Sequence, residues 1–213
     1  MLIGLTGGYC AGKNRVAGLL EARGFTSIDV DRLGHRALDL AKPAVVRRFG
    51  EGILAADGSI DRKTLGAIVF ADHKALADHE AIVHPHMFAL VEESVAELHA
   101  RGSGSILINA AILYRMPIAA TCDAILEVRA CLPRRLLRAW SRDRSGIFRT
   151  VARIRSQKAL WKLRDSARIK PLVIHNDGSP ARLEDRLEAR LEASLQILQG
   201  ESKAGSAGKA VFR

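Results

Sequence analysis

The chain has 213 residues, 48% of them hydrophobic, and it carries a formal net charge of +10 at pH 7. This length and composition favour one α/β domain with a substantial core and room for an insertion. No apolar run approaches the roughly 20 residues that a membrane-spanning helix needs. The N-terminus also lacks the basic region and cleavage site of a signal peptide. The scattered cysteines Cys10, Cys122 and Cys131 argue against a disulfide framework, so we expect a cytoplasmic protein.

The positive charge has two explanations. An excess of lysine and arginine is typical of nucleic-acid binding, but it serves a ligand with many phosphates equally well. The basic residues gather between Arg129 and Arg168, where few aromatic side chains are available to stack on bases. We therefore expect phosphorylated small molecules as partners, and no nucleic acid.

The start of the chain predicts a strand, a glycine-containing loop and a helix. Gly7, Gly12 and Lys13 stand at the spacing of the phosphate-binding loop, G-x-x-x-x-G-K-[ST]. Glycines let backbone N–H groups approach phosphate oxygens, the helix adds its positive end, and the lysine reaches the outer phosphates. The alternative is a glycine turn that holds no ligand. The predicted phosphate-binding residues are Gly7, Gly8, Tyr9, Cys10, Ala11, Gly12, Lys13, Asn14 and Arg15.

Asn14 departs from this motif. It stands where serine or threonine normally offers a hydroxyl group to Mg2+. Because Mg2+ prefers oxygen ligands, the amide oxygen of Asn14 is the candidate ligand for the ion or for one of its water molecules.

A second short strand is predicted over residues 26–31, and Asp31 ends it. In open α/β sheets, ligands bind beyond the carboxyl ends of the parallel strands. We therefore expect Asp31 at the same edge of the sheet as the loop, as a general base or as a carboxylate near Mg2+. The alternative is an N-cap for a helix over residues 32–40, a role that aspartate favours.

A helical insertion is predicted over about residues 42–101, where no strand-like alternation occurs. One of its helices covers residues 44–49. A longer one covers about residues 74–98, with an interruption near Pro85 because proline removes a backbone donor.

Two histidines of this insertion, His84 and His86, suggest a metal site, but no second cluster of ligands accompanies them. A capping or substrate-contacting role is therefore expected for His84.

Three further strands are predicted over residues 105–109, 124–128 and 171–175. Short apolar strands separated by helices predict an α/β fold with a five-stranded, mostly parallel sheet that is covered on both faces. A charged amphipathic helix then extends to about Leu198. A tail over residues 201–213, rich in glycine, alanine, serine and lysine, is expected to be disordered.

The segment after the fourth strand carries arginines at helical spacing. Arg135, Arg138 and Arg142 share one face of a predicted helix. Guanidinium groups bind phosphate bidentately, so such a face fits a mobile segment that closes over ATP. The alternative is a solvated basic face. A second predicted helix carries Arg149, Arg153 and Arg155.

A colinear set of short motifs runs from Met1 to about Leu198. Its members are Gly4–Gly8, Ala11–Lys13, Ile28–Asp31, Phe49–Gly50, Asp57–Arg62, Val69–Phe70, Ile82–Pro85, Cys122–Asp123, Arg138, Arg142–Asp143, Arg153–Ile154, Ser156–Gln157 and Asn176–Ser179. Together they resemble the dephospho-coenzyme A kinase family.

The resemblance implies a P-loop NTPase-type three-layer core over residues 1–200, an insertion that takes the coenzyme moiety, and a small lid over about residues 138–158. The implied reaction is ATP-dependent, uses Mg2+, and phosphorylates the ribose 3′-hydroxyl of dephospho-coenzyme A. Asp31 matches the second aspartate of the family's D-x-D segment, the expected base. The residues expected to act are Asp31, Lys13 and Arg142 in catalysis, Arg138 on ATP, and Asp31 and His84 on the substrate.

Three positions depart from the family pattern. Asn14-Arg15 replace Ser-Thr, Arg115 replaces the glutamate of Pro-Leu-Leu-Phe-Glu, and Lys170-Pro171 replace Ala-Asp. The alternatives are therefore another small-molecule P-loop kinase, such as one acting on nucleoside monophosphates, and a nucleotide-binding homologue without activity.

Overall fold

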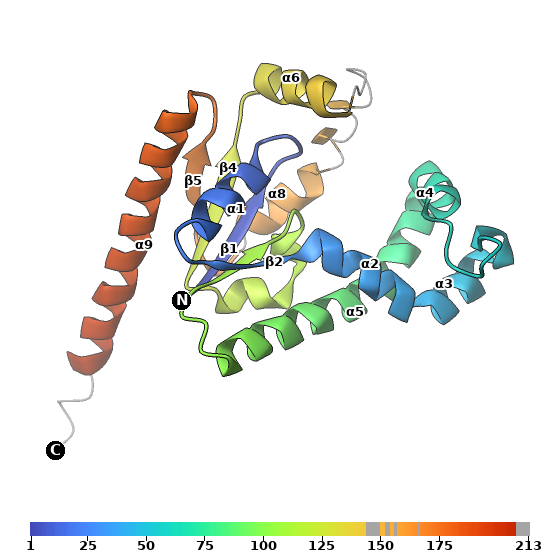
Figure 1. The fold of residues 1–213 in the computed structure, drawn as a ribbon, viewed down its shortest axis with the longest axis horizontal. Coiled ribbons are helices and arrows are strands. Elements are labelled where there is room, and N and C mark those ends of the chain that lie inside the picture. The colour runs from blue at the N-terminus through green and yellow to red at the C-terminus, as the bar shows by residue number, and fades with distance from the viewer. Residues whose placement is uncertain (144–149, 152–153, 156, 166, 208–213) are drawn as a thin grey trace. The chain divides into compact units, whose positions relative to one another are not determined.

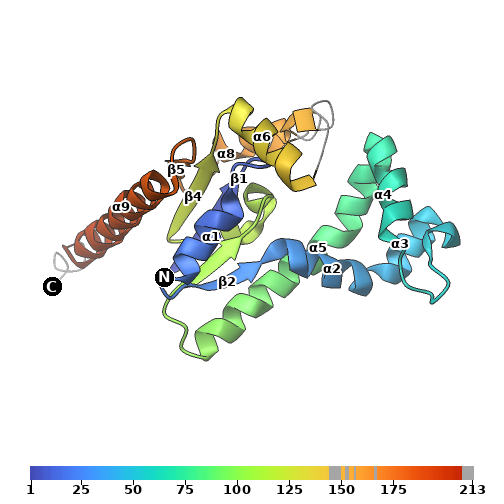
Figure 2. The same ribbon diagram turned by 45° about the horizontal axis from the view of Figure 1, so that its top comes forward.

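The computed structural model describes residues 1–143, 150–151, 154–155, 157–165 and 167–207. The chain forms two compact units, one made of Met1–Ser27 and Ser103–Arg213 and the other of Ile28–Gly102. Figures 1 and 2 show the ribbon in two views, coloured along the chain. In the described part of the chain, no helix is long and apolar enough to cross a membrane.

A five-stranded sheet forms the centre of the fold, in the order β2-β3-β1-β4-β5. Its pairings of β1 with β3, of β1 with β4 and of β4 with β5 are all parallel. The central strand β1 is buried at every residue, as its uninterrupted apolar sequence predicts. The strands are β1 (Leu2–Gly7), β2 (Thr26–Asp29), β3 (Ile106–Asn109), β4 (Ala124–Arg129) and β5 (Leu172–His175). The predicted five-stranded, mostly parallel sheet is thus confirmed.

The helices α1 (Lys13–Glu21) and α9 (Pro180–Ala207) cover one face of the sheet. In both views α9 runs beside β5. The core between this pair and the sheet contains the buried side chains Ile3, Leu5, Val16, Leu20, Leu107, Leu126, Ile174, Leu183 and Leu187.

The opposite face is covered by two 3-10 turns, η2 (Leu113–Arg115) and η3 (Pro117–Thr121), and by α8 (Lys158–Asp165). Leu113 packs so closely on the central strand that a Cβ atom at Gly4 would lie 2.6 Å from its Cδ2 atom. Helices on one face and these turns with α8 on the other complete the expected three-layer architecture.

The second unit is helical. Its elements are α2 (Val30–Leu40), α3 (Lys42–Phe49), η1 (Glu51–Ile53), α4 (Arg62–Ala71) and α5 (His73–Ala100). Aspartates cap three of these helices. The side chain of Asp29 accepts N–H groups at the start of α2, that of Asp61 does so for α4, and that of Asp72 for α5. The predicted insertion over residues 42–101 lies within this unit. The unit begins earlier, at Ile28, because α2 packs against α5.

The predicted interruption at Pro85 is wrong, because α5 continues through it. Proline inside a helix costs roughly 3 kcal/mol, through a lost hydrogen bond and a steric clash. The buried face of α5, which includes Val83, Met87, Leu90 and Val91, offsets that cost by packing in the core of the unit.

Two further boundaries differ from the prediction. The second strand ends at Asp29 and α2 begins at Val30, so Asp31 lies in the first helical turn instead of ending the strand. At the other end of the chain, α9 continues to Ala207, beyond the residue 201 at which the tail was expected to begin.

The predicted lid over residues 138–158 includes the end of α6 (Leu132–Asp143). The second predicted arginine helix falls largely on residues outside the described ones, among them Arg149, Arg153 and Ser156.

Shortening a core side chain of β4 should destabilise the fold. Leu126 is fully buried between α1, α9 and the sheet, so Leu126→Ala should lower the free energy of unfolding by about 2–5 kcal/mol through lost burial and a cavity. The control is Leu137→Ala in α6, where the side chain is 62% exposed. Urea denaturation should show a change of less than about 0.5 kcal/mol for the control. Equal losses for both variants would contradict this view of the core.

Candidate active site

The loop between β1 and α1 has the backbone of a phosphate-binding loop. The chain leaves β1 at Gly7, and Ala11 N–H donates to the carbonyl of Gly8 at 2.9 Å to form a turn. Cys10 has a φ of 57° and Gly12 a φ of 99°, both in the left-handed region, and α1 begins at Lys13. Left-handed residues in a turn are typical of anion-binding loops, in which backbone N–H groups point towards a common centre. The described residues provide no side-chain cap at the start of α1, so its first N–H groups can bind phosphate.

Close packing explains why two of the loop positions are glycine. A Cβ atom at Gly12 would lie 2.1 Å from Nδ2 of Asn176, on a backbone that already disfavours side chains. A Cβ atom at Gly8 would lie 2.8 Å from a guanidinium nitrogen of Arg135. The glycines therefore give room to the side chains that hold the loop.

Lys13, the predicted phosphate-binding lysine, lies in the first turn of α1, and its Nζ atom donates to Oδ1 of Asn109. Asn109 ends β3 and is only 5% exposed. This amide fixes the ammonium group at the carboxyl edge of the sheet. Asn109 was not predicted as a site residue, although its place at the end of a predicted strand was a usable signal.

The arginine face of α6 points at the loop. Arg135 Nε donates to the carbonyl of Tyr9 at 2.7 Å. Arg138 donates to the carbonyl of Ala11 at 3.0 Å. The guanidinium group of Arg142 lies 5.4 Å from the ring centroid of Tyr9, a cation–π distance. The predicted shared face is thus confirmed, while the action of these arginines on ATP stays a prediction.

Two more side chains hold the loop and were not predicted as site residues. Asn176 follows β5 and donates through Nδ2 to the carbonyl of Ala11 at 2.9 Å, and its own carbonyl accepts from Arg138 at 2.8 Å. Gln157 accepts the N–H group of Tyr9 through Oε1 at 2.7 Å. Both stand in motifs that carry the family resemblance, which was the available signal.

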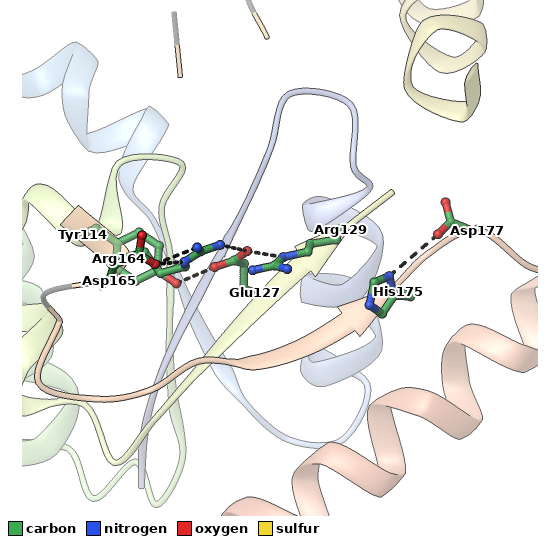
Figure 3. A network of polar contacts seen from close by, with 7 residues as sticks. All are labelled: Tyr114, Glu127, Arg129, Arg164, Asp165, His175 and Asp177. Atoms are coloured by element: carbon green, nitrogen blue, oxygen red, sulfur yellow. Dashed lines mark hydrogen bonds and ion pairs between the residues drawn. The ribbon is translucent and has the colours of Figure 1, made fainter. Parts of the chain in front are cut away.

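Glu127 is a buried carboxylate on β4, the strand next to β1. It is paired in register with Thr6 of β1, just before the phosphate loop. It is 1% exposed and accepts the hydroxyl group of Tyr114 at 2.7 Å and Nε of Arg129 at 2.5 Å. Arg164 of α8 lies 3.8 Å away, and Figure 3 shows Glu127 between Arg129 on one side and Tyr114 and Arg164 on the other. Burial and the neighbouring carboxylate raise the pKa of Tyr114 above its usual value, so its hydroxyl group stays a donor.

At the end of β5, Nδ1 of His175 lies 3.9 Å from a carboxylate oxygen of Asp177, a contact also drawn in Figure 3. The N–H group of Cys131, which donates to Asp177 at 2.6 Å, lowers the pKa of Asp177 below its usual value. This carboxylate therefore ties the start of α6 to the turn that contains Asn176.

The predicted residues of the second unit lie on its helices. Asp31 is exposed in the first turn of α2. The N-cap role considered for it belongs to Asp29, whose side chain accepts from the N–H groups of Asp31 at 3.0 Å and Arg32 at 3.3 Å. His84 is half-buried in α5, with its ring 5.5 Å from that of Phe88.

The donor chemistry for Mg2+ fits at Asn14. Its side chain is exposed on the first turn of α1, beside Lys13. Among the residues described, no group of three or more His, Cys, Asp or Glu side chains gathers to hold a metal. A single amide oxygen nevertheless suits Mg2+, because this ion keeps several water molecules and binds substrate phosphates.

Comparisons with known proteins identify the family of this chain. The family model of dephospho-CoA kinase matches residues 1–182. The dephospho-CoA kinase of Geobacter sulfurreducens is 38% identical over 190 residues, which cover 88% of this chain and 95% of the relative. That of Anaeromyxobacter dehalogenans is 36% identical over 198 residues, covering 92% of each chain.

Solved structures share the fold. A protein from Thermus thermophilus superposes with a TM-score of 0.73 at 30% identity, covering 91% of this chain and 97% of that one. A dephospho-CoA kinase from Campylobacter jejuni superposes with a TM-score of 0.58 at 22% identity, covering 91% and 96%. Because the family model spans most of the chain and relatives of that name match along most of their own length, the chain belongs to the dephospho-CoA kinase family.

Proposed function

We propose that this chain transfers the γ-phosphoryl group of ATP to the ribose 3′-hydroxyl of dephospho-CoA and releases ADP and coenzyme A. Family membership supports this acceptor over a nucleoside monophosphate. The observation that carries the proposal to individual residues is the loop itself. Lys13 follows it at the start of α1, and three arginines of α6 contact it, two through the carbonyls of Tyr9 and Ala11 and one over the Tyr9 ring.

ATP binding would rest on the loop and its lysine. N–H groups of the loop other than those of Tyr9 and Ala11, together with those at the start of α1, would hold the phosphate chain, and Lys13 would neutralise charge on the outer phosphates. Asn109 accepts a hydrogen bond from the Lys13 ammonium group and would hold it near these phosphates. Phosphoryl transfer needs little covalent chemistry from a protein, so positioning and charge neutralisation would supply most of the rate.

Two arginines of α6 would have different roles in binding ATP. Arg138 is bonded to the carbonyls of Ala11 and Asn176, which supports a role in shaping the ATP site. Arg142 lies over the Tyr9 ring near the exposed end of α6, so we expect its guanidinium group to reach the ATP phosphates.

Asp31 is our candidate for the base. Its exposed carboxylate would accept the proton of the 3′-hydroxyl group as the hydroxyl oxygen bonds to the γ-phosphorus. The bond from that phosphorus to the β–γ bridging oxygen breaks at the same time, and ADP leaves. The match of Asp31 to the D-x-D segment supports this assignment. We further propose that the helical unit takes the coenzyme moiety and that His84 contacts it.

Asn14 would hold Mg2+ or one of its water molecules through its amide oxygen. When bound, the ion neutralises charge on the β- and γ-phosphates. We also propose a cytoplasmic protein with no nucleic-acid partner, because its cysteines are free thiols and its arginines cluster on the phosphate loop.

Replacing the lysine tests the ATP site. Lys13→Ala should reduce turnover by roughly a hundredfold or more, because it removes one electrostatic stabiliser of the transition state. A coupled assay of ADP release, with and without dephospho-CoA, measures this. Lys170→Ala, which changes an exposed lysine of the same unit, should keep full activity. Unchanged turnover in Lys13→Ala would remove the loop from the mechanism.

Replacing the proposed base tests the acceptor chemistry. Asp31→Asn keeps the size of the side chain and removes its basicity, so the rate should fall roughly a hundredfold or more while ATP still binds. The matched control is Asp39→Asn, at the exposed end of the same helix α2. Full activity of Asp31→Asn in the ADP-release assay would mean that the base lies elsewhere.

Restoring the usual residue tests the metal ligand. Asn14→Ser should retain ATP turnover and shift its dependence on Mg2+ concentration, since a hydroxyl group replaces an amide oxygen. Titration of Mg2+ in the ADP-release assay compares the two proteins. If the natural chain is inactive at millimolar Mg2+ and Asn14→Ser is active, the natural chain is a silent nucleotide binder and the proposed function fails.

A further inference from the structure

A cavity of about 220 Å3 lies beside the phosphate loop. Three arginines from different elements line it: Arg129 at the end of β4, Arg135 of α6 and Arg164 of α8. Among the described residues that line it, the carboxylate of Glu127 is the one acidic group. The charges of the three guanidinium groups exceed that of the one carboxylate, and the excess is only partly offset by the exposed Asp165, which is bonded to Arg164.

The guanidinium groups of this cavity retain donors for a ligand. An arginine has five N–H donors in one plane. Within the described residues, Arg129 uses its Nε group on Glu127, and Arg135 uses its Nε group on the carbonyl of Tyr9. The Nη groups of both remain for an acceptor. Burial lowers the pKa of Arg135, but a guanidinium group stays charged at neutral pH.

The buried carboxylate fixes the position of these cations. Glu127 holds Arg129 at 2.5 Å and has Arg164 at 3.8 Å from the same Oε1 atom, while Tyr114 bonds its other oxygen. A carboxylate that is 1% exposed cannot move without losing these partners. Figure 3 shows Arg129 and Arg164 reaching Glu127 from two sides. The two guanidinium groups are therefore ordered before any ligand arrives, which lowers the entropic cost of binding.

The other residues that line the cavity are uncharged, and two of them belong to the phosphate loop. Gly8 and Ala11 join the cavity to the phosphate loop, and the indole ring of Trp161 closes part of it. Trp161 stands edge-on to Tyr114, with ring centroids 6.4 Å apart. An anion here would face guanidinium donors and an aromatic wall, while the N–H groups inside the loop serve the nucleotide.

We propose that this cavity is a second anion site, separate from the interior of the phosphate loop, and that it takes a small phosphate-bearing anion. Guanidinium groups on several sides match the spread of oxygens on a phosphate group, which accepts bidentate hydrogen bonds. Free diphosphate and the phosphate chain of a nucleotide share this chemistry, so the test separates them.

Trp161 provides the readout. The chain has two tryptophans, so Trp140→Phe, at an exposed position of α6, leaves Trp161 as the reporter. Inorganic diphosphate is titrated at constant ionic strength, and we expect a saturable change in emission. The change should persist when Lys13→Ala is added, because Lys13 does not line the cavity. ADP release measured in parallel reports the proposed kinase activity, so the two proposals can fail separately.

The arginines provide the specificity of the test. Arg164→Ala and Arg129→Ala should each weaken diphosphate binding by roughly tenfold or more, the effect of losing a charge-assisted hydrogen bond. Lys162→Ala, an exposed charge on the same helix α8, is the matched control and should not change it. Circular dichroism melting checks that each variant folds. If Arg164→Ala does not fold, the diphosphate affinity of Arg129→Ala tests the proposal.

The outcomes divide as follows. In the Lys13→Ala background, a response to diphosphate alone assigns the site to a free anion, and a response to ATP as well assigns it to a phosphate chain in either form; both support the proposal. An absent response, a response lost with Lys13→Ala, or arginine variants that bind like Lys162→Ala would overturn it.

Discussion

A loop that turns its amide N–H groups inward must turn its carbonyl oxygens outward, and those oxygens need partners of their own. In this chain the partners come from far along the sequence. Arg135 donates a hydrogen bond to the carbonyl of Tyr9, while Arg138 and Asn176 both donate to the carbonyl of Ala11. The loop is therefore held by α6 and by the turn after β5, and not by its own sequence alone. Positions that pack against these side chains, such as Gly12, cannot accept a Cβ atom. The loop motif, the arginine helix and the end of β5 thus form one structural unit.

The sequence predicted those parts of the fold that depend on local pattern. Uninterrupted apolar runs bounded by turns gave five strands close to their observed bounds, because a strand buried on both faces leaves this signal. The spacing of Arg135, Arg138 and Arg142 gave their shared face, since helical periodicity determines which residues are neighbours. The spacing of Gly7, Gly12 and Lys13 predicted the loop, because this motif is contained in one short stretch of sequence.

The predictions that were wrong or incomplete share a cause. In each case the outcome depends on contacts with other elements, which the local sequence does not reveal. Pro85 predicts a break, yet α5 buries enough apolar surface around it to continue. Asp29 and Asp31 are both suitable N-caps, and only the observed helix start at Val30 assigns the role to Asp29. Asn109 and Glu127 are single polar residues in apolar strands, and their roles depend on partners from other elements, Lys13 in one case and Tyr114 with two arginines in the other.

The positive charge shows why composition alone leaves function open. A net charge of +10 is compatible with nucleic-acid binding and with phosphate ligands alike. The structure shows how part of that charge is used: Arg135 and Arg138 are bonded to loop carbonyls, and Arg129 and Arg164 face a buried carboxylate. Cations fixed in this way lie close to the phosphate loop, which supports the proposal of small phosphate-bearing ligands. Extended nucleic acid would instead require donors spread along an open surface. The direction in which each guanidinium group is held, more than the total charge, therefore points to phosphate-bearing small molecules.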